Sequence, residues 1–145
     1  MSMQVKDIMK TDVKTIEPDD TVQEAARRMN ENGIGSLIVT DKDSLRGIVT
    51  DRDILVKVVI NADDASKVLV KDVMTKDVVL INPDISVEDA SEVMIEKNIK
   101  KLPVVEDDSL IGIVTATDIV ASQPKLMEQL SRLLLIPGKR KKIAG

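Results

Sequence analysis

The sequence predicts a mixed α/β (α+β) fold built from two tandem copies of one strand–helix–strand–strand–helix unit, followed by a C-terminal helix. The first observation behind this prediction is an internal repeat. Residues 5–55 and 70–120 align without a gap at an offset of 65, and 25 of the 51 aligned positions are identical. The second is that apolar spacing in each copy alternates between the short runs of strands and the three-and-four spacing of helices. Two copies exposing the same apolar face are expected to pack with pseudo-twofold symmetry.

Each copy opens with a short β-prone run and a helix. The runs 13–16 and 78–81 each stop before a proline, which disfavours helical backbone at the preceding residue. Thr21 and Ser86 are each followed three residues later by an acidic residue, a pattern that predicts a helix start. Gly33 and Asn98 occupy equivalent positions, where a left-handed residue is expected to end the helix.

A hairpin and a second helix complete each copy. The first copy is expected to have strands at 37–40 and 46–49 with a turn at 41–44. The second copy is expected to have strands at 102–105 and 111–114 with a turn at 106–109. The second helices are expected to begin at Thr50 and Thr115.

The chain therefore divides into three predicted segments. The first copy spans residues 5–64, the second spans 65–122, and residues 123–145 form a C-terminal extension. Residues 125–136 have the spacing of an amphipathic helix, with leucines on one face. That face can cover the protein's own core or contact a second chain. Residues 139–142 form a basic tail.

Composition excludes several kinds of site. Histidine and cysteine are absent, which removes the usual general base, the thiolate nucleophile and the commonest transition-metal ligands. Phe, Tyr and Trp are also absent, so bases cannot stack on aromatic side chains. The net charge is −4, which disfavours a nucleic-acid backbone as partner. No apolar run reaches the length of a membrane span, and we expect a cytoplasmic protein that is not an enzyme.

Four motifs in register in the two copies resemble the CBS domain family. The sequence reads GIVTDRDI at 47–54 and GIVTATDI at 112–119, and the lead-in VKDIM at 5–9 recurs as VKDVM at 70–74. The run IKKLPVV at 99–105 is similar to the family's first long strand. Position 38, which the second copy fills with Pro103, holds isoleucine and departs from the family pattern. The resemblance covers about residues 5–122.

The resemblance implies a regulatory module without a catalytic cofactor. CBS domains occur in tandem and bind adenosine-containing ligands in clefts built from both copies. The expected ligand is AMP, ADP or ATP, with S-adenosylmethionine or NAD as further candidates. The resemblance also implies a homodimer that reports ligand binding to a partner protein, which the sequence does not identify.

Asp118 and Asp53 are the central residues of the two expected clefts. A carboxylate accepts hydrogen bonds only, which suits the two ribose hydroxyls, and the resemblance gives both aspartates that role. Thr115 and Thr50, three residues earlier, can cap the following helix or contact the ligand. For the Asp118 cleft the resemblance adds Lys10, Thr11, Ile34, Gly35, Lys100 and Thr117. For the Asp53 cleft it adds Arg52, Thr75, Lys76, Ile99 and Lys100.

The two clefts are expected to differ in affinity. Arg52 places a forked cation beside Asp53, whereas Thr117 stands at the matching position beside Asp118. Two other functions remain open at this point. One is a protein-interaction scaffold with empty clefts, and the other is a nucleic-acid regulator acting through the basic tail.

Overall fold

The computed structural model describes residues 3–134, which form two compact units. The α1 unit contains residues 12–79 with the turn 107–110, and the α4 unit contains residues 3–11, 80–106 and 111–134. The lead-in of each sequence copy thus belongs to the unit that holds the core of the other copy. The basic tail predicted at 139–142 lies outside the described residues.

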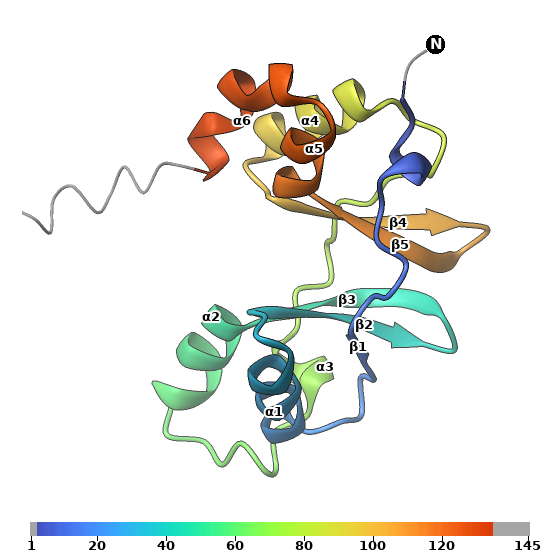
Figure 1. The fold of residues 1–145 in the computed structure, drawn as a ribbon. Coiled ribbons are helices and arrows are strands. Elements are labelled where there is room, and N and C mark those ends of the chain that lie inside the picture. The colour runs from blue at the N-terminus through green and yellow to red at the C-terminus, as the bar shows by residue number, and fades with distance from the viewer. Residues whose placement is uncertain (1–2, 135–145) are drawn as a thin grey trace, which may run out of the picture. The chain divides into compact units, whose positions relative to one another are not determined.

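The α1 unit is a small sheet covered by helices on one face (Figure 1). Its elements are β1 (Thr15–Ile16), α1 (Val22–Asn32), β2 (Ser36–Asp41), β3 (Ser44–Thr50), α2 (Asp51–Ile54), the π-helix η2 (Leu55–Val59) and α3 (Val70–Val73). Strand β1 pairs with β2 in parallel, and β2 pairs with β3 antiparallel, with Ile38 opposite Ile48.

The α4 unit repeats this arrangement and adds a C-terminal helix. Its elements are the 3₁₀ helix η1 (Val5–Asp7), α4 (Val87–Lys97), β4 (Lys101–Glu106), β5 (Ser109–Thr115), α5 (Ala116–Ser122), the 3₁₀ helix η3 (Pro124–Leu126) and α6 (Met127–Leu134). Strands β4 and β5 are neighbours in the sheet, and Ile81 bridges Val104 in parallel, as Ile16 bridges Val39 in the other unit. The predicted mixed α/β class with a C-terminal helix is confirmed.

The ends of α1 and α4 follow the predicted caps. The hydroxyls of Thr21 and Ser86 accept hydrogen bonds from the backbone N–H groups of Glu24 and Asp89. Gly33 and Asn98 end the helices with φ of 63° and 56°. The left-handed conformation stops each helix and turns the chain towards the next strand.

The lead-ins complete both cores. Val70 and Val73 of α3 are buried in the cluster that contains Ile16, Leu37 and Val49. In the α4 unit, Val5 of η1 is likewise fully buried. Each lead-in also bridges a strand: Thr75 and Ile48 exchange two backbone hydrogen bonds of 2.8 and 2.9 Å, and Lys10 and Ile113 exchange two of 2.9 Å. Burial and backbone pairing together fix where residues 10 and 75 lie.

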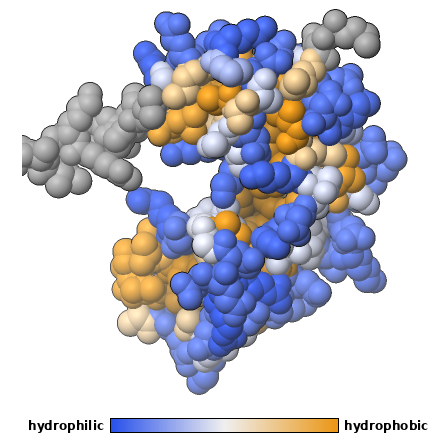
Figure 2. Space-filling model, viewed as in Figure 1, coloured by the Kyte–Doolittle hydropathy of each residue, from blue (hydrophilic) through white to orange (hydrophobic). Residues whose placement is uncertain are grey.

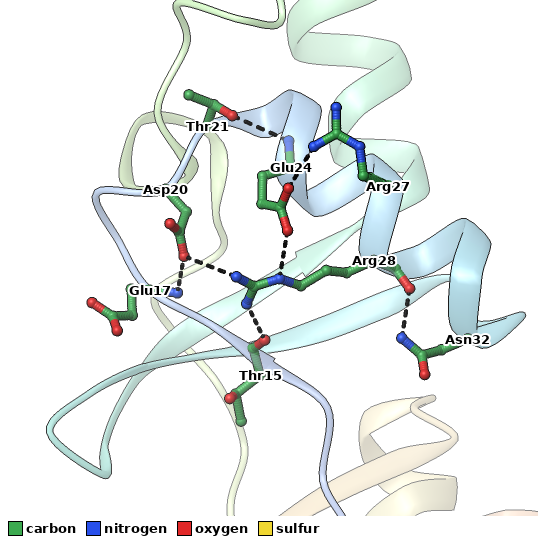
Figure 3. A network of polar contacts seen from close by, with 8 residues as sticks. All are labelled: Thr15, Glu17, Asp20, Thr21, Glu24, Arg27, Arg28 and Asn32. Atoms are coloured by element: carbon green, nitrogen blue, oxygen red, sulfur yellow. Dashed lines mark hydrogen bonds and ion pairs between the residues drawn. The ribbon is translucent and has the colours of Figure 1, made fainter.

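A polar network ties α1 to the start of β1 (Figure 3). The Arg28 guanidinium donates to the Glu24 carboxylate at 2.9 Å and to the Thr15 carbonyl oxygen at 2.9 Å. Arg27 donates to the other Glu24 oxygen at 2.6 Å. The hydrogen bonds from Arg28 and Arg27 hold the pKa of Glu24 below its usual 4.5. The network is local to the α1 unit and pairs Glu24 with Arg27 and Arg28, and Arg28 also with Asp20.

Candidate functional site

The predicted threonine–aspartate pairs form two equivalent helix caps. The Thr50 N–H donates to Asp53 Oδ2 at 3.0 Å, and the Asp53 N–H donates to Thr50 Oγ1 at 3.1 Å. Thr115 and Asp118 make the same reciprocal pair at 3.1 Å each. Both pairs therefore cap α2 and α5, and this capping leaves the second oxygen of each aspartate, Oδ1, for other partners.

A lysine lies beside each of these second oxygens, and the two lysines have different origins. Lys10 Nζ lies 3.4 Å from Asp118 Oδ1, and Lys57 Nζ lies 3.4 Å from Asp53 Oδ1. Lys10 comes from the lead-in, as predicted, and its side chain is 68% exposed, whereas the Asp118 side chain is 14% exposed. Each half-buried carboxylate thus has a cation that partly neutralises it.

Lys57 was missed by the sequence prediction. It lies four residues after Asp53, a helical spacing that brings oppositely charged side chains together and is readable from the sequence. Its ammonium group also donates to the Val73 carbonyl oxygen at 2.7 Å. Lys57 is therefore held at two points, whereas the exposed Lys10 ammonium contacts Asp118.

The strand-entry residues meet the second helices within each unit. The Asp51 N–H donates to the Gly35 carbonyl oxygen at 2.9 Å, and the Ala116 N–H donates to that of Lys100 at 2.8 Å. Ile34 and Gly35 therefore lie in the unit of Asp53, and Ile99 and Lys100 in the unit of Asp118. The expected contributions of Ile34 and Gly35 to the Asp118 cleft, and of Ile99 and Lys100 to the Asp53 cleft, stay predictions.

The remaining predicted site residues lie on the surface of the same two units. The exposed ones in the α4 unit are Thr11, Lys100 and Thr117. Those in the α1 unit are Arg52, Thr75 and Lys76. Exposed polar and cationic side chains in the same unit as a largely buried carboxylate are the kinds of group that a ligand carrying both hydroxyl groups and phosphate requires.

A groove that the sequence did not predict lies between α1 and α2. Its volume is about 540 Å³. The residues lining it are Ala26, Met29, Asn30, Gly33, Ile34, Gly35, Asp51, Ile54 and Leu55. The lining is mainly apolar, which distinguishes it from the charged surroundings of Asp53.

Two further properties of residues 3–134 bear on function. Within this range no three acidic, histidine or cysteine side chains gather as metal ligands would. None of the helices in this range is both long enough and apolar enough to cross a membrane.

Comparison with known proteins finds the same repeat. The family model described as "CBS domain" matches residues 5–60 and 70–125. An uncharacterised protein of Methanopyrus kandleri is 40% identical over 128 residues, which are 87% of this chain and 65% of that protein. A CBS domain-containing protein of Bacillus subtilis is 39% identical over 119 residues, covering 82% of this chain and 84% of that protein. The chain thus spans just under two thirds of the first relative and most of the second.

The same repeat also occurs inside a larger enzyme. Inosine-5'-monophosphate dehydrogenase of Korarchaeum cryptofilum is 46% identical over 109 residues, which are 74% of this chain and only 22% of the enzyme. The similarity therefore covers a minor part of that enzyme.

Solved structures share the fold. A putative signal-transduction protein with CBS domains from Burkholderia ambifaria matches with a TM-score of 0.73 at 33% identity, covering 83% of this chain and 93% of that one. A hexameric CBS-CP12 protein from bloom-forming cyanobacteria matches with a TM-score of 0.71 at 31% identity, covering 88% and 75%. Oligomeric proteins are thus among the structural relatives.

Proposed function

Because the chain belongs to the CBS domain family, we propose that it is a regulatory module that binds an adenosine-containing nucleotide at Asp118 and, more weakly, at Asp53. CBS pairs are regulatory modules that commonly bind adenosine-containing ligands. AMP, ADP and ATP are the proposed ligands, with S-adenosylmethionine and NAD as further candidates. The regulated partner stays unidentified, and a cytoplasmic location stays a prediction.

The arrangement of Asp118 and Lys10 carries the proposal. Capping occupies Asp118 Oδ2, so Oδ1 is the oxygen that can accept hydrogen bonds from the ribose hydroxyls. Lys10 lies 3.4 Å from that oxygen on a largely exposed side chain. When the ribose hydroxyls donate hydrogen bonds to Oδ1, they take the place of Lys10 there, and the exposed Lys10 ammonium can turn to the phosphate. Thr115, Thr117 and Lys100 supply further polar groups in the same unit.

Lys57 supports a weaker site at Asp53. A ribose hydroxyl must compete with Lys57 for Asp53 Oδ1, and the hydrogen bond from Lys57 to Val73 holds the ammonium in place. Lys57 is therefore less free than Lys10 to move to a phosphate. We expect the Asp118 site to fill first.

Ligand-dependent unfolding tests the proposal. The chain has no Trp or Tyr, so unfolding is followed by circular dichroism or calorimetry with AMP, ADP, ATP, S-adenosylmethionine and NAD. A ligand at about 100 times its Kd stabilises the fold by about 2.7 kcal/mol, a midpoint shift of several degrees. Each variant is compared with its own ligand-free midpoint, which separates binding from loss of the cap.

Matched variants of the two copies assign the sites. Asp118→Asn keeps an oxygen that can cap α5 but loses the charge, and it should abolish most of the shift. Asp53→Asn makes the same change in the other copy and should reduce the shift less. Absence of a shift with every ligand overturns the proposal.

The other functions make distinct predictions. A scaffold with empty clefts shows no shift with any nucleotide and retains its protein contacts. A regulator acting through residues 139–142 binds nucleic acid in a salt-dependent way that truncation of the tail removes. The expectation that the chain is not an enzyme stays a prediction, and the similarity to part of a dehydrogenase is compatible with a regulatory role.

A further inference from the structure

Lys57 is the one charged residue in an apolar segment. Residues 54–60 read ILVKVVI, and Figure 2 shows hydrophobic surface over α2 and the segment after it. The exposed large apolar side chains of this segment are Leu55, Val56, Val59 and Ile60. The Lys57 ammonium lies 3.4 Å from Asp53 Oδ1 and donates to the Val73 carbonyl oxygen at 2.7 Å. Its own segment offers it no second carboxylate.

The backbone that carries Lys57 is held in place. Leu55–Val59 forms a π-helix, a rare backbone form that occurs frequently at functional sites. Val58, the next residue, is 1% exposed and belongs to the core of the unit. The Asn61 side-chain amide donates to the Lys57 carbonyl oxygen at 3.0 Å. The lysine side chain therefore starts from an anchored backbone, and Val73 holds its far end.

The bond to Val73 keeps the ammonium beside the site. The helix α3 ends at Val73, and the last carbonyls of a helix have no partner within that helix. Lys57 supplies the partner that this carbonyl lacks. An ammonium has three donors, so Lys57 can keep Val73 and still donate to a new acceptor. A ribose hydroxyl that displaces Lys57 from Asp53 therefore leaves the charge next to the ligand.

The lysine of the other copy is less constrained. The Lys10 side chain is 68% exposed and that of Lys57 is 44% exposed, whereas each aspartate side chain that they contact is only 14% exposed. The position that matches Lys57 holds Ser122, whose hydroxyl donates to a carbonyl of its own helix. Displacing Lys10 from Asp118 frees it into water, but the displaced Lys57 ammonium stays where it needs a new anion.

We propose that Lys57 makes the Asp53 site selective for phosphorylated ligands against the neutral nucleoside. This selectivity rests on the proposed nucleotide binding and adds which ligands the second site accepts. The ribose hydroxyls of AMP donate to Asp53 Oδ1, and the phosphate on the same ribose pairs with the ammonium that they displace. Adenosine has the hydroxyls but no phosphate, so it breaks the ion pair and offers Lys57 no counter-charge. The Asp118 site should discriminate less.

Calorimetric titration with AMP and with adenosine tests the proposal on full chains that keep one site each. Asp118→Asn leaves the Asp53 site, and Asp53→Asn leaves the Asp118 site. The measured quantity is the Kd of adenosine divided by the Kd of AMP. This ratio should be about ten- to a hundredfold larger in the Asp118→Asn chain, the range expected for one hydrogen bond to a charged group.

Two substitutions of Lys57 identify the ammonium as the cause. Lys57→Met, made in the Asp118→Asn chain, removes the charge and keeps a flexible unbranched side chain. It should lower the ratio by about the same factor, mainly because adenosine then binds without breaking an ion pair. Lys57→Arg keeps a cation and should keep the ratio high. Lys57 is nearly half exposed, so both variants should fold, and their ligand-free unfolding midpoints check this.

A matched control removes the same charge elsewhere in the α1 unit. Lys71 pairs with Asp19 at 3.0 Å, and Lys71→Met should leave the ratio unchanged. A ratio that Lys57→Met does not lower, or one equally large in the Asp53→Asn chain, overturns the proposal while AMP binding still supports the proposed function. An Asp118→Asn chain that binds neither ligand, with or without Lys57→Met, also overturns it. Failure of AMP to bind either single-site chain overturns the proposed function as well.

Discussion

Replacing Gly47 by alanine tests whether the lead-in of the second copy closes the core of the first. A Cβ atom at position 47 would lie 2.6 Å from the Thr75 carbonyl oxygen and 3.1 Å from Met74 Sδ. The carbonyl belongs to backbone that pairs with Ile48 through two hydrogen bonds, so it cannot move without weakening them. Gly47→Ala should therefore push the lead-in away from β3.

The expected loss of stability follows from these contacts. Overpacking a tight site costs about 1–3 kcal/mol, and each weakened hydrogen bond adds about 0.5–1.5 kcal/mol. Replacing the glycine also stabilises the fold by about 0.4–1 kcal/mol, because alanine lowers the conformational entropy of the unfolded chain. The net loss should be about 2–4 kcal/mol, which lowers the unfolding midpoint by about 10 °C in a chain of this size.

The repeat supplies a matched control. A Cβ atom at Gly112 would meet Met9 Sδ at 2.6 Å, but the nearest backbone atom, the Lys10 carbonyl oxygen, lies farther away at 3.0 Å. A methionine side chain can rotate away, so Gly112→Ala should cost about 1 kcal/mol or less. Urea unfolding followed by circular dichroism measures the free energy of unfolding of the Gly47→Ala and Gly112→Ala variants. Equal losses, or a Gly47→Ala chain as stable as wild type, would refute the reasoning.

Three further predictions concern packing, charge and capping. Leu130→Ala should cost about 2–5 kcal/mol in urea unfolding, because this α6 side chain is fully buried where α6 packs against α4 and α5, and its loss leaves a cavity. The depressed pKa of Glu24 stabilises the fold above the usual value of 4.5, and this contribution is lost as pH falls through the folded pKa. Glu24→Gln should therefore flatten the acid limb of a stability–pH curve, and an unchanged limb would contradict this. Thr115→Ala should cost about 1 kcal/mol without ligand, measured by thermal unfolding, because it removes the α5 cap.

The local elements could be predicted because their signals lie within a few residues. The caps at Thr21, Gly33, Ser86 and Asn98 are set by single side chains or by one backbone conformation. The hairpin turns are equally local: Asp43 and Asp108 have φ of 70° and 65°, as tight hairpin turns require. The two copies carry equivalent residues at each of these positions, so each local prediction rests on two sequences that fold into the same structure.

Other elements differ from the prediction because distant contacts decide them. The strand expected at 13–16 is only Thr15–Ile16, and the one expected at 78–81 is a single bridge at Ile81. Their β-branched residues favour extended backbone, but β2 and Val104 offer pairing partners to only part of each run. The π-helix at Leu55–Val59 has no sequence signature that distinguishes it from an α-helix.

The apolar pattern did not by itself assign each lead-in to the unit of the other copy, which only the family resemblance implied. Residues 5–9 and 70–74 are nearly identical, so the apolar pattern alone would let either lead-in complete the core of either unit. Lys10 was predicted beside Asp118 through the family resemblance, and the structure places it 3.4 Å away. Lys57 has no counterpart in the second copy, where Ser122 stands at the matching position, so the repeat carries no signal for it.

The exchanged lead-ins bear on how such a chain could have arisen. A molecule with a single copy would carry one lead-in and one core. If the lead-in could not reach its own core, a second molecule would have to supply the lead-in that completes it. Joining two copies in one gene turns that encounter into an event within one chain, where the effective concentration of the lead-in is far higher. Duplication then fixes the pairing, and each half becomes free to change its surface. The two halves now differ in this way: Lys10 of one lead-in matches Thr75 of the other, and only the α4 unit carries α6. Two identical chains in a symmetric pair could not have acquired such differences.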